Sequence, residues 1–149
     1  MSSQVSPRRE AGLGPALARA TVGDVMHRGV FSCPPDAPLR EIADVMASES
    51  VHAVVVAGIA HDGGPPVWGM VSGLDLAAAF ALGPDGVTAA KVACTEPVTT
   101  SARATLADAA RLMTEHNVSH LVVVAADGTP TGVVSTMDLA RALAWGVGG

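Results

Sequence analysis

The chain has 149 residues, of which 49% are hydrophobic and 3% aromatic, which predicts one domain of ordinary size with an aliphatic core. Its net charge of −5 and its single lysine, Lys91, argue against a nucleic-acid-binding protein, which would carry a basic face. The two cysteines fit no disulfide framework. No apolar run could span a bilayer, and the N-terminus resembles no signal peptide. We therefore expect a cytoplasmic protein without membrane contact.

The N-terminal part of the chain predicts a flexible tail over residues 1–20, followed by an apolar turn over 22–26 and a short strand over 30–32. An amphipathic helix comes next, with Asp36 as a candidate cap near its start. Its apolar residues have the spacing i, i+3, i+4 and i+7, which places them on one helical face. These residues are Leu39, Ile42, Ala43 and Met46.

Two strands and a second helix complete this first unit. The continuous apolar run 53–57 is typical of a strand buried on both faces. A loop rich in Gly, Pro and Asp over 59–66 separates it from a strand over 67–71, and a helix over 74–82 follows. The predicted order of elements is therefore β-α-β-β-α.

The second half of the chain repeats this order. Residues from Thr88 onward align with those from Thr21, and the sequence Gly-x-Val-Ser-x-x-Asp-Leu occurs at 69–76 and again at 132–139. The repeated elements are a turn over 89–93, a strand over 98–100, a helix at 106–113 capped by Thr105, strands over 121–125 and 131–134, and a helix over 137–145.

We therefore predict a mixed α/β (α+β) fold, in which two β-α-β-β-α repeats pack with pseudo-twofold symmetry. The repeats cover residues 21–82 and 88–145, with a linker over 83–87 and a tail over 146–149. A unit of about 60 residues is marginally stable alone, which favours packing of the two repeats around a shared core.

The order, spacing and duplication of these pieces resemble a tandem pair of CBS domains, the regulatory modules named after cystathionine β-synthase. The resemblance rests on Val25-Met26, the helix from Leu39, the valine-rich strand and the repeated Gly-x-Val-Ser-x-x-Asp-Leu. It implies a stand-alone module that senses an adenosine-containing ligand, AMP, ADP, ATP or S-adenosylmethionine, bound between the repeats. It implies no tightly bound cofactor.

The resemblance also implies which residues contact this ligand. Asp75 and Asp138 would accept hydrogen bonds from ribose hydroxyls, and Ser72 and Ser135 would approach the ribose or phosphate. His120 is a candidate phosphate contact, with Ala53 at the corresponding position of the first repeat. Because aromatic residues are scarce, adenine is expected to lie against aliphatic side chains: Val30, Val51, Val98 and Val118.

Other interpretations remain open at this stage. Ser72-x-x-Asp75 and Ser135-x-x-Asp138 also fit capping boxes that need no ligand. The chain could be a ligand-free scaffold that forms homodimers through its alanine-rich helices, or a metal- or redox-responsive variant that uses Cys33, Cys94 and histidines. A regulated partner protein is expected but not specified. The sequence contains no catalytic motif, so we predict no enzymatic activity.

Overall fold

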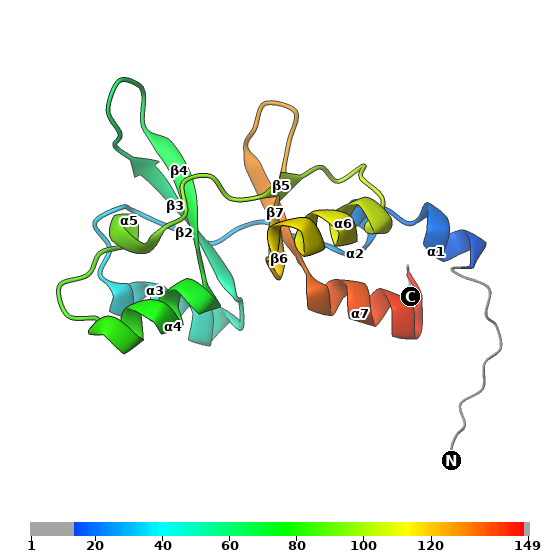
Figure 1. Ribbon diagram of the computed structural model, residues 1–149, viewed down its shortest axis with the longest axis horizontal. Coiled ribbons are helices and arrows are strands. Elements are labelled where there is room, and N and C mark those ends of the chain that lie inside the picture. The colour runs from blue at the N-terminus through cyan, green and yellow to red at the C-terminus, as the bar shows by residue number, and fades with distance from the viewer. Residues whose placement is uncertain (1–13, 148–149) are drawn as a thin grey trace, which may run out of the picture.

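The computed structural model describes residues 14–147 (Figure 1). It contains two β-α-β-β-α units, as predicted, each preceded by a short helix. In chain order the elements are α1 (Pro15–Arg19), α2 (Val22–Val25), β1 (His27–Arg28), β2 (Ser32–Cys33), α3 (Leu39–Glu49), β3 (Ala53–Ile59), β4 (Val67–Ser72), α4 (Gly73–Leu82), α5 (Ala89–Val92), β5 (Thr99–Thr100), α6 (Leu106–His116), β6 (His120–Val124), β7 (Pro130–Ser135) and α7 (Thr136–Trp145).

The two long amphipathic helices, α3 and α6, form as their apolar spacing predicts. They bury Leu39 and Ile42 in one repeat, and Leu106, Ala109 and Met113 in the other. Both helices end at a residue in the left-handed conformation, Ser50 or Asn117, at corresponding positions of the repeat. This conformation is a common helix stop.

The predicted caps of these two helices differ in outcome. Thr105 is the N-cap of α6, and its side chain accepts a hydrogen bond from the Asp108 backbone amide. Asp36 does not cap α3, so that prediction is wrong. The N-cap residue of α3 is Pro38, which makes no side-chain capping bond. Asp36 lies two residues before this position.

Each repeat has its own sheet. The first has the strand order β2-β3-β4, and the second has the order β1-β7-β6-β5. Central strands β3 and β6 pair in parallel with β2 and β5, and antiparallel with β4 and β7. Strand β3 buries four consecutive residues and β6 buries three. These runs confirm the prediction of strands covered on both faces. Ala53 and Met70 pack against Val122, so an apolar cluster joins the two sheets.

The segments that precede the repeats exchange partners, which the sequence analysis did not predict. Strand β1 pairs antiparallel with β7 of the second repeat, and Cys94 forms the corresponding bridge to Met70 in β4. Val22 of α2 is buried in the second core, while Ala89 of α5 is buried in the first. Figure 1 shows the same exchange, with α2 beside α6 and α5 beside β3 and β4.

Part of the expected N-terminal tail is helical. The tail was predicted over 1–20, but α1 begins at Pro15, a residue that favours the first turn of a helix. Ala20 is buried and packs with Leu106 and Ala142, beside the partly buried Leu17. This apolar contact holds the segment against α6 and α7. The remainder of the predicted N-terminal tail, 1–13, and residues 148–149 lie outside the described part of the chain.

Gly69 and Gly132 lie on β4 and β7, where the exchanged segments pair with these strands. A Cβ atom at Gly69 would lie 2.7 Å from the Cys94 carbonyl oxygen, and one at Gly132 would overlap the His27 carbonyl oxygen and Met26. The two carbonyl oxygens belong to paired backbone segments and cannot move aside without disturbing that pairing, whereas Met26 contributes a side-chain methyl group. The absence of a side chain at both positions therefore permits the exchange.

We expect Gly69→Ala and Gly132→Ala each to lower the free energy of unfolding by about 1–3 kcal/mol, the usual cost of overpacking. Urea unfolding followed by circular dichroism measures the change. Gly73→Ala is the matched control, because a Cβ atom there meets nothing within 4 Å. Equal stability of all three variants would show that these pairings tolerate a side chain.

Candidate ligand-binding cleft

The repeated Ser-x-x-Asp motifs form capping boxes at the starts of α4 and α7. In the first, Asp75 Oδ2 accepts hydrogen bonds from the Ser72 amide at 2.8 Å and the Ser72 hydroxyl at 2.9 Å. In the second, Asp138 Oδ2 accepts the same bonds from Ser135 at 2.8 and 3.1 Å. The capping interpretation is therefore confirmed. It occupies one oxygen of each carboxylate and leaves the other for further contacts.

The second oxygens of the two carboxylates have different surroundings. Asp138 Oδ1 lies 3.1 Å from His27 Nε2 and 3.6 Å from the Arg141 guanidinium, and the Asp138 side chain is only 4% exposed. Asp75 is half-buried, and within residues 14–147 its Oδ1 has no hydrogen bond or ion pair. The duplicated motif thus has two unequal environments.

A cleft of about 370 Å³ lies between the repeats on the Asp138 side. Its walls come from two segments of the first repeat, 27–31 and 49–53, and from β6, β7 and α7 of the second. The second-repeat residues that line it are His120, Val133, Ser135, Met137 and Arg141. Because the exchanged strand β1 supplies part of the wall, both repeats are required to form the cleft.

The structure divides the predicted site residues into two groups. One group lines this cleft: Val30, Val51, Ser135 and His120. Asp138 lies directly behind it, in contact with the lining residues His27 and Arg141. The remaining four predicted residues, Ser72, Asp75, Val98 and Val118, do not line it. Ser72 and Asp75 form the capping box of α4, while Val98 and Val118 pack against the core of the second repeat.

Several cleft residues were missed by the sequence analysis. His27, His52 and Arg141 line the cleft, and Phe31 adds an aromatic side chain where only aliphatic residues were expected to face adenine. Phe31 is 42% exposed, so its ring is accessible to a ligand. Their repeat counterparts are Cys94, Ser119, Ala78 and Val98. These differences between the repeats are the one signal in the sequence that could have identified them.

His120 lines the cleft, close to His52. The ring centroids are 5.9 Å apart, and His120 Nδ1 is 2.9 Å from the Ser119 hydroxyl. Burial lowers the pKa of His120 below its ordinary value, the charge of His52 lowers it further, and Asp138 acts in the opposite direction. The partly buried environment of the ring therefore favours its neutral form.

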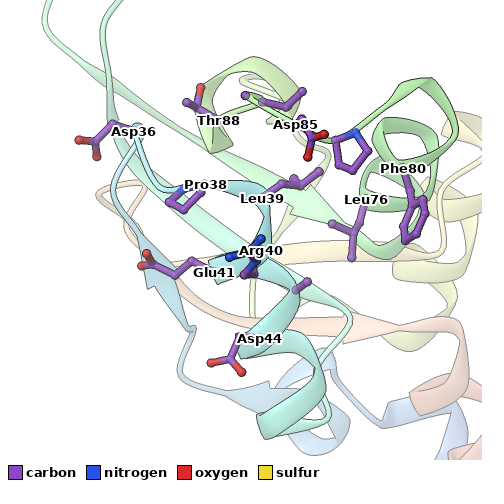
Figure 2. Close-up of a pocket in the computed structure, with 14 residues that line it drawn as sticks. Asp36, Pro38, Leu39, Arg40, Glu41, Asp44, Leu76, Phe80, Asp85 and Thr88 are labelled. Carbon is purple, nitrogen blue, oxygen red and sulfur yellow. The ribbon is translucent and has the colours of Figure 1, made fainter.

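A second hollow of about 850 Å³ lies on the first repeat, between α3, α4 and the loop of residues 84–88. Figure 2 shows Leu39, Leu76 and Phe80 beside it. Four acidic residues line it against a single arginine: Asp36, Glu41, Asp44 and Asp85, with Arg40. None of the predicted site residues lines this hollow, and its acidic character disfavours a phosphorylated ligand.

The described residues form neither a metal site nor a membrane-spanning helix. Within residues 14–147, no group of three His, Cys, Asp or Glu side chains is placed to hold a metal ion. In the same part of the chain, no helix combines the length and apolar character needed to cross a membrane.

Comparison with known protein families assigns the chain to one of them. The CBS domain family model matches residues 22–82 and again 89–144, so the chain belongs to the CBS domain family and carries two copies of the domain. A comparison with curated proteins found no match.

Solved structures give the same fold. A CBS domain protein from Pyrobaculum aerophilum, complexed with AMP, is 32% identical and has a TM-score of 0.66 over 80% of this chain and 89% of that one. The CBS domain pair of protein MJ0100, in complex with 5′-methylthioadenosine and S-adenosyl-L-methionine, is 18% identical, with a TM-score of 0.71 over 83% and 99%. Hypoxic Response Protein I, with two coordinated zinc ions, is 26% identical, with a TM-score of 0.63 over 82% and 98%.

The lowered pKa of His120 predicts a specific pH dependence of stability. The unfolded chain binds more protons at this site than the folded protein, so stability is lost as the pH falls below the unfolded pKa of about 6.5. We expect His120→Gln to lose less free energy of unfolding than the unsubstituted protein between about pH 7.5 and about pH 5.5. Urea titrations at each pH measure this.

The matched control is His61→Gln, because His61 is exposed in the loop between β3 and β4. It should follow the unsubstituted protein at every pH. An unchanged pH slope in His120→Gln would contradict the expected protonation penalty.

Proposed function

We propose that this protein is a non-catalytic regulatory module that binds an adenosine-containing ligand between its two CBS domains. The observation that carries the proposal is the cleft on the Asp138 side, because both repeats form its walls. Its volume of about 370 Å³ lies in the usual range for small-molecule sites. The AMP complex of the Pyrobaculum aerophilum relative supports the same assignment.

The proposed contacts follow from the residues around the cleft. Val30, Val51 and Phe31 would contact adenine, and Ser135 and Asp138 would contact the ribose. Asp138 can keep Oδ2 in the capping box while Oδ1 exchanges His27 or Arg141 for a ribose hydroxyl. Capping and ligand binding are therefore compatible roles of one carboxylate.

A second site of the same kind is proposed around Asp75. Its free Oδ1 faces no competing cation among the described residues, and Ser72, Val98 and Val118 occupy the corresponding positions. The ligand class remains AMP, ADP, ATP or S-adenosylmethionine, bound reversibly rather than as a tight cofactor.

Regulation would arise from the shared walls of the cleft. A ligand that contacts segment 27–31 also contacts the segment that pairs with β7, so binding is coupled to the packing of the two repeats. Such coupling requires that the ligand bind one packing arrangement more tightly than another. A partner protein would then respond to the difference. Cys33 and Cys94 are both free thiols, which agrees with the proposed cytoplasmic location.

The redox-responsive alternative has less support. Cys33 is buried, and this burial raises the pKa of its thiol, with a smaller contribution from the nearby charge of Glu41. A raised pKa disfavours the reactive thiolate at neutral pH.

Ligand binding is tested by thermal unfolding and calorimetry with AMP, ATP and S-adenosylmethionine. At a ligand concentration about 100 times Kd, binding should stabilise the protein by about 2.7 kcal/mol. The double variant Asp75→Ala, Asp138→Ala should lose this gain, because both ribose acceptors are removed.

Asp108→Ala is the control for this experiment. It removes the corresponding residue of the α6 capping box, but Asp108 does not line the cleft. Asp108→Ala should keep its ligand response. A protein that responds to none of the three compounds, or a double variant with unchanged affinity, would contradict the proposed function and favour the ligand-free scaffold.

A second function, self-association, is favoured by the exposed faces of α4 and α7. Each helix exposes large apolar side chains at the same three repeat positions, between 56% and 90% exposed. These residues are Leu74, Phe80 and Leu82 in α4, and Met137, Leu143 and Trp145 in α7. Large apolar side chains exposed at matching positions of both helices favour an interaction surface, and we propose that a second copy of the chain covers part of it as a homodimer.

Phe80→Glu combined with Leu143→Glu should shift the protein from dimer to monomer, because the two charges would be buried without partners. Sedimentation equilibrium measures the molecular mass. Thr114→Glu, at an exposed position of α6, is the control and should stay dimeric. A monomeric unsubstituted protein would refute the proposed dimer.

A further inference from the structure

The cleft on the Asp138 side contains three of the five histidines of the chain. His27, His52 and His120 line it together with Arg141. Arg28 also lines it, but its guanidinium donates a hydrogen bond to the Gly23 carbonyl at 3.1 Å. Outside the capping box, these side chains are the principal hydrogen-bond donors facing the space.

The acidic groups that face these donors are Glu49 and Asp138. Glu49 is exposed at the end of α3 and lines the cleft. Asp138 is buried, and its Oδ1 is shared between His27 and Arg141 at 3.1 and 3.6 Å. Both side chains are half or more exposed, so each can turn toward an anion in the cleft while the carboxylate remains in its capping box.

The corresponding positions around Asp75 lack these cationic groups. His27, His52 and Arg141 correspond to Cys94, Ser119 and Ala78. The duplication therefore kept the helix starts, with their serines and aspartates, but placed the basic side chains on one side only. Capping alone does not require this difference, because the capping box at Ser72 forms without basic neighbours.

An anion in the cleft would favour protonation of the histidine rings that line it. The lowered pKa of His120 reflects burial and the charge of His52, so protonation is disfavoured in the free protein. A phosphate within hydrogen-bond distance would favour the protonated rings, and charge-assisted hydrogen bonds to His⁺ and Arg are stronger than neutral ones.

We propose that the Asp138-side cleft selects its adenosine ligand by a phosphate group held by His27, His52, His120 and Arg141, and that the Asp75 side has no such selectivity. The ligand class of this cleft is therefore a nucleoside mono- or diphosphate rather than a nucleoside or a sulfonium cation. This inference rests on the proposed function and specifies which of its candidate ligands binds here.

Calorimetry on the full chain compares AMP, ADP, adenosine, S-adenosylmethionine and inorganic pyrophosphate. We expect AMP to bind at least about tenfold more tightly than adenosine or S-adenosylmethionine, as charge-assisted bonds allow. AMP affinity should fall severalfold from about pH 7 to about pH 8.5, because a bound phosphate favours proton uptake by the cleft and this uptake becomes harder as the pH rises, while adenosine affinity stays constant. Both conditions lie above the second pKa of a phosphomonoester, about 6, so the change reports on the protein.

Matched double variants locate the effect. His52→Gln with Arg141→Gln should bring AMP affinity down to that of adenosine. His61→Gln with Arg111→Gln removes the same residue types from exposed positions outside the cleft and should keep the preference for AMP.

The outcomes separate this inference from the proposed function. If adenosine and S-adenosylmethionine bind the unsubstituted protein as tightly as AMP, phosphate selection is wrong and the proposed function stands. If pyrophosphate binds and no adenosine compound does, the anion site stands and the proposed function is wrong. If none of the compounds binds, both are overturned.

Discussion

The close contact between backbones at Gly69 and Gly132 is the constraint on which the rest of the structure depends. At these points, the segment that precedes one repeat pairs with the edge of the other repeat's sheet, and no side chain fits between them. The contact lets β1 extend the second sheet and lets α2 and α5 enter the opposite cores. It also brings residues 27–31 against β7 and α7, where they form one wall of the cleft.

On this symmetric framework, the two helix starts have different chemistry. The capping boxes of α4 and α7 have nearly the same hydrogen bonds, so the backbone positions each aspartate in the same way. The difference lies in side chains contributed by the other repeat and by the next turn of the helix. His27 and Arg141 surround Asp138, whereas Cys94 and Ala78 occupy the corresponding positions near Asp75. The same helix start therefore has a basic environment at Asp138 and lacks one at Asp75.

Local patterns made much of this predictable from the sequence. The apolar spacing of α3 and α6 and the Ser-x-x-Asp motifs depend on residues three or four positions apart, and the valine-rich strands are recognisable as continuous apolar runs; the structure has each of them. The exchange of β1 was not predictable in this way, because His27 and Arg28 are exposed and have no apolar pattern. His27, Phe31 and Arg141 acquire their place only through tertiary packing of distant segments.

The exchange also has a consequence for how such a chain can arise. The segment that precedes each repeat packs into the core of the other repeat, so a one-repeat chain would need a second molecule to make the same contact. Joining two copies by the short linker after α4 turns that intermolecular exchange into an intramolecular one. Once both halves are encoded separately, each can accumulate its own substitutions. Gene fusion would thus have allowed the surroundings of Asp138 to gain basic side chains that the surroundings of Asp75 lack.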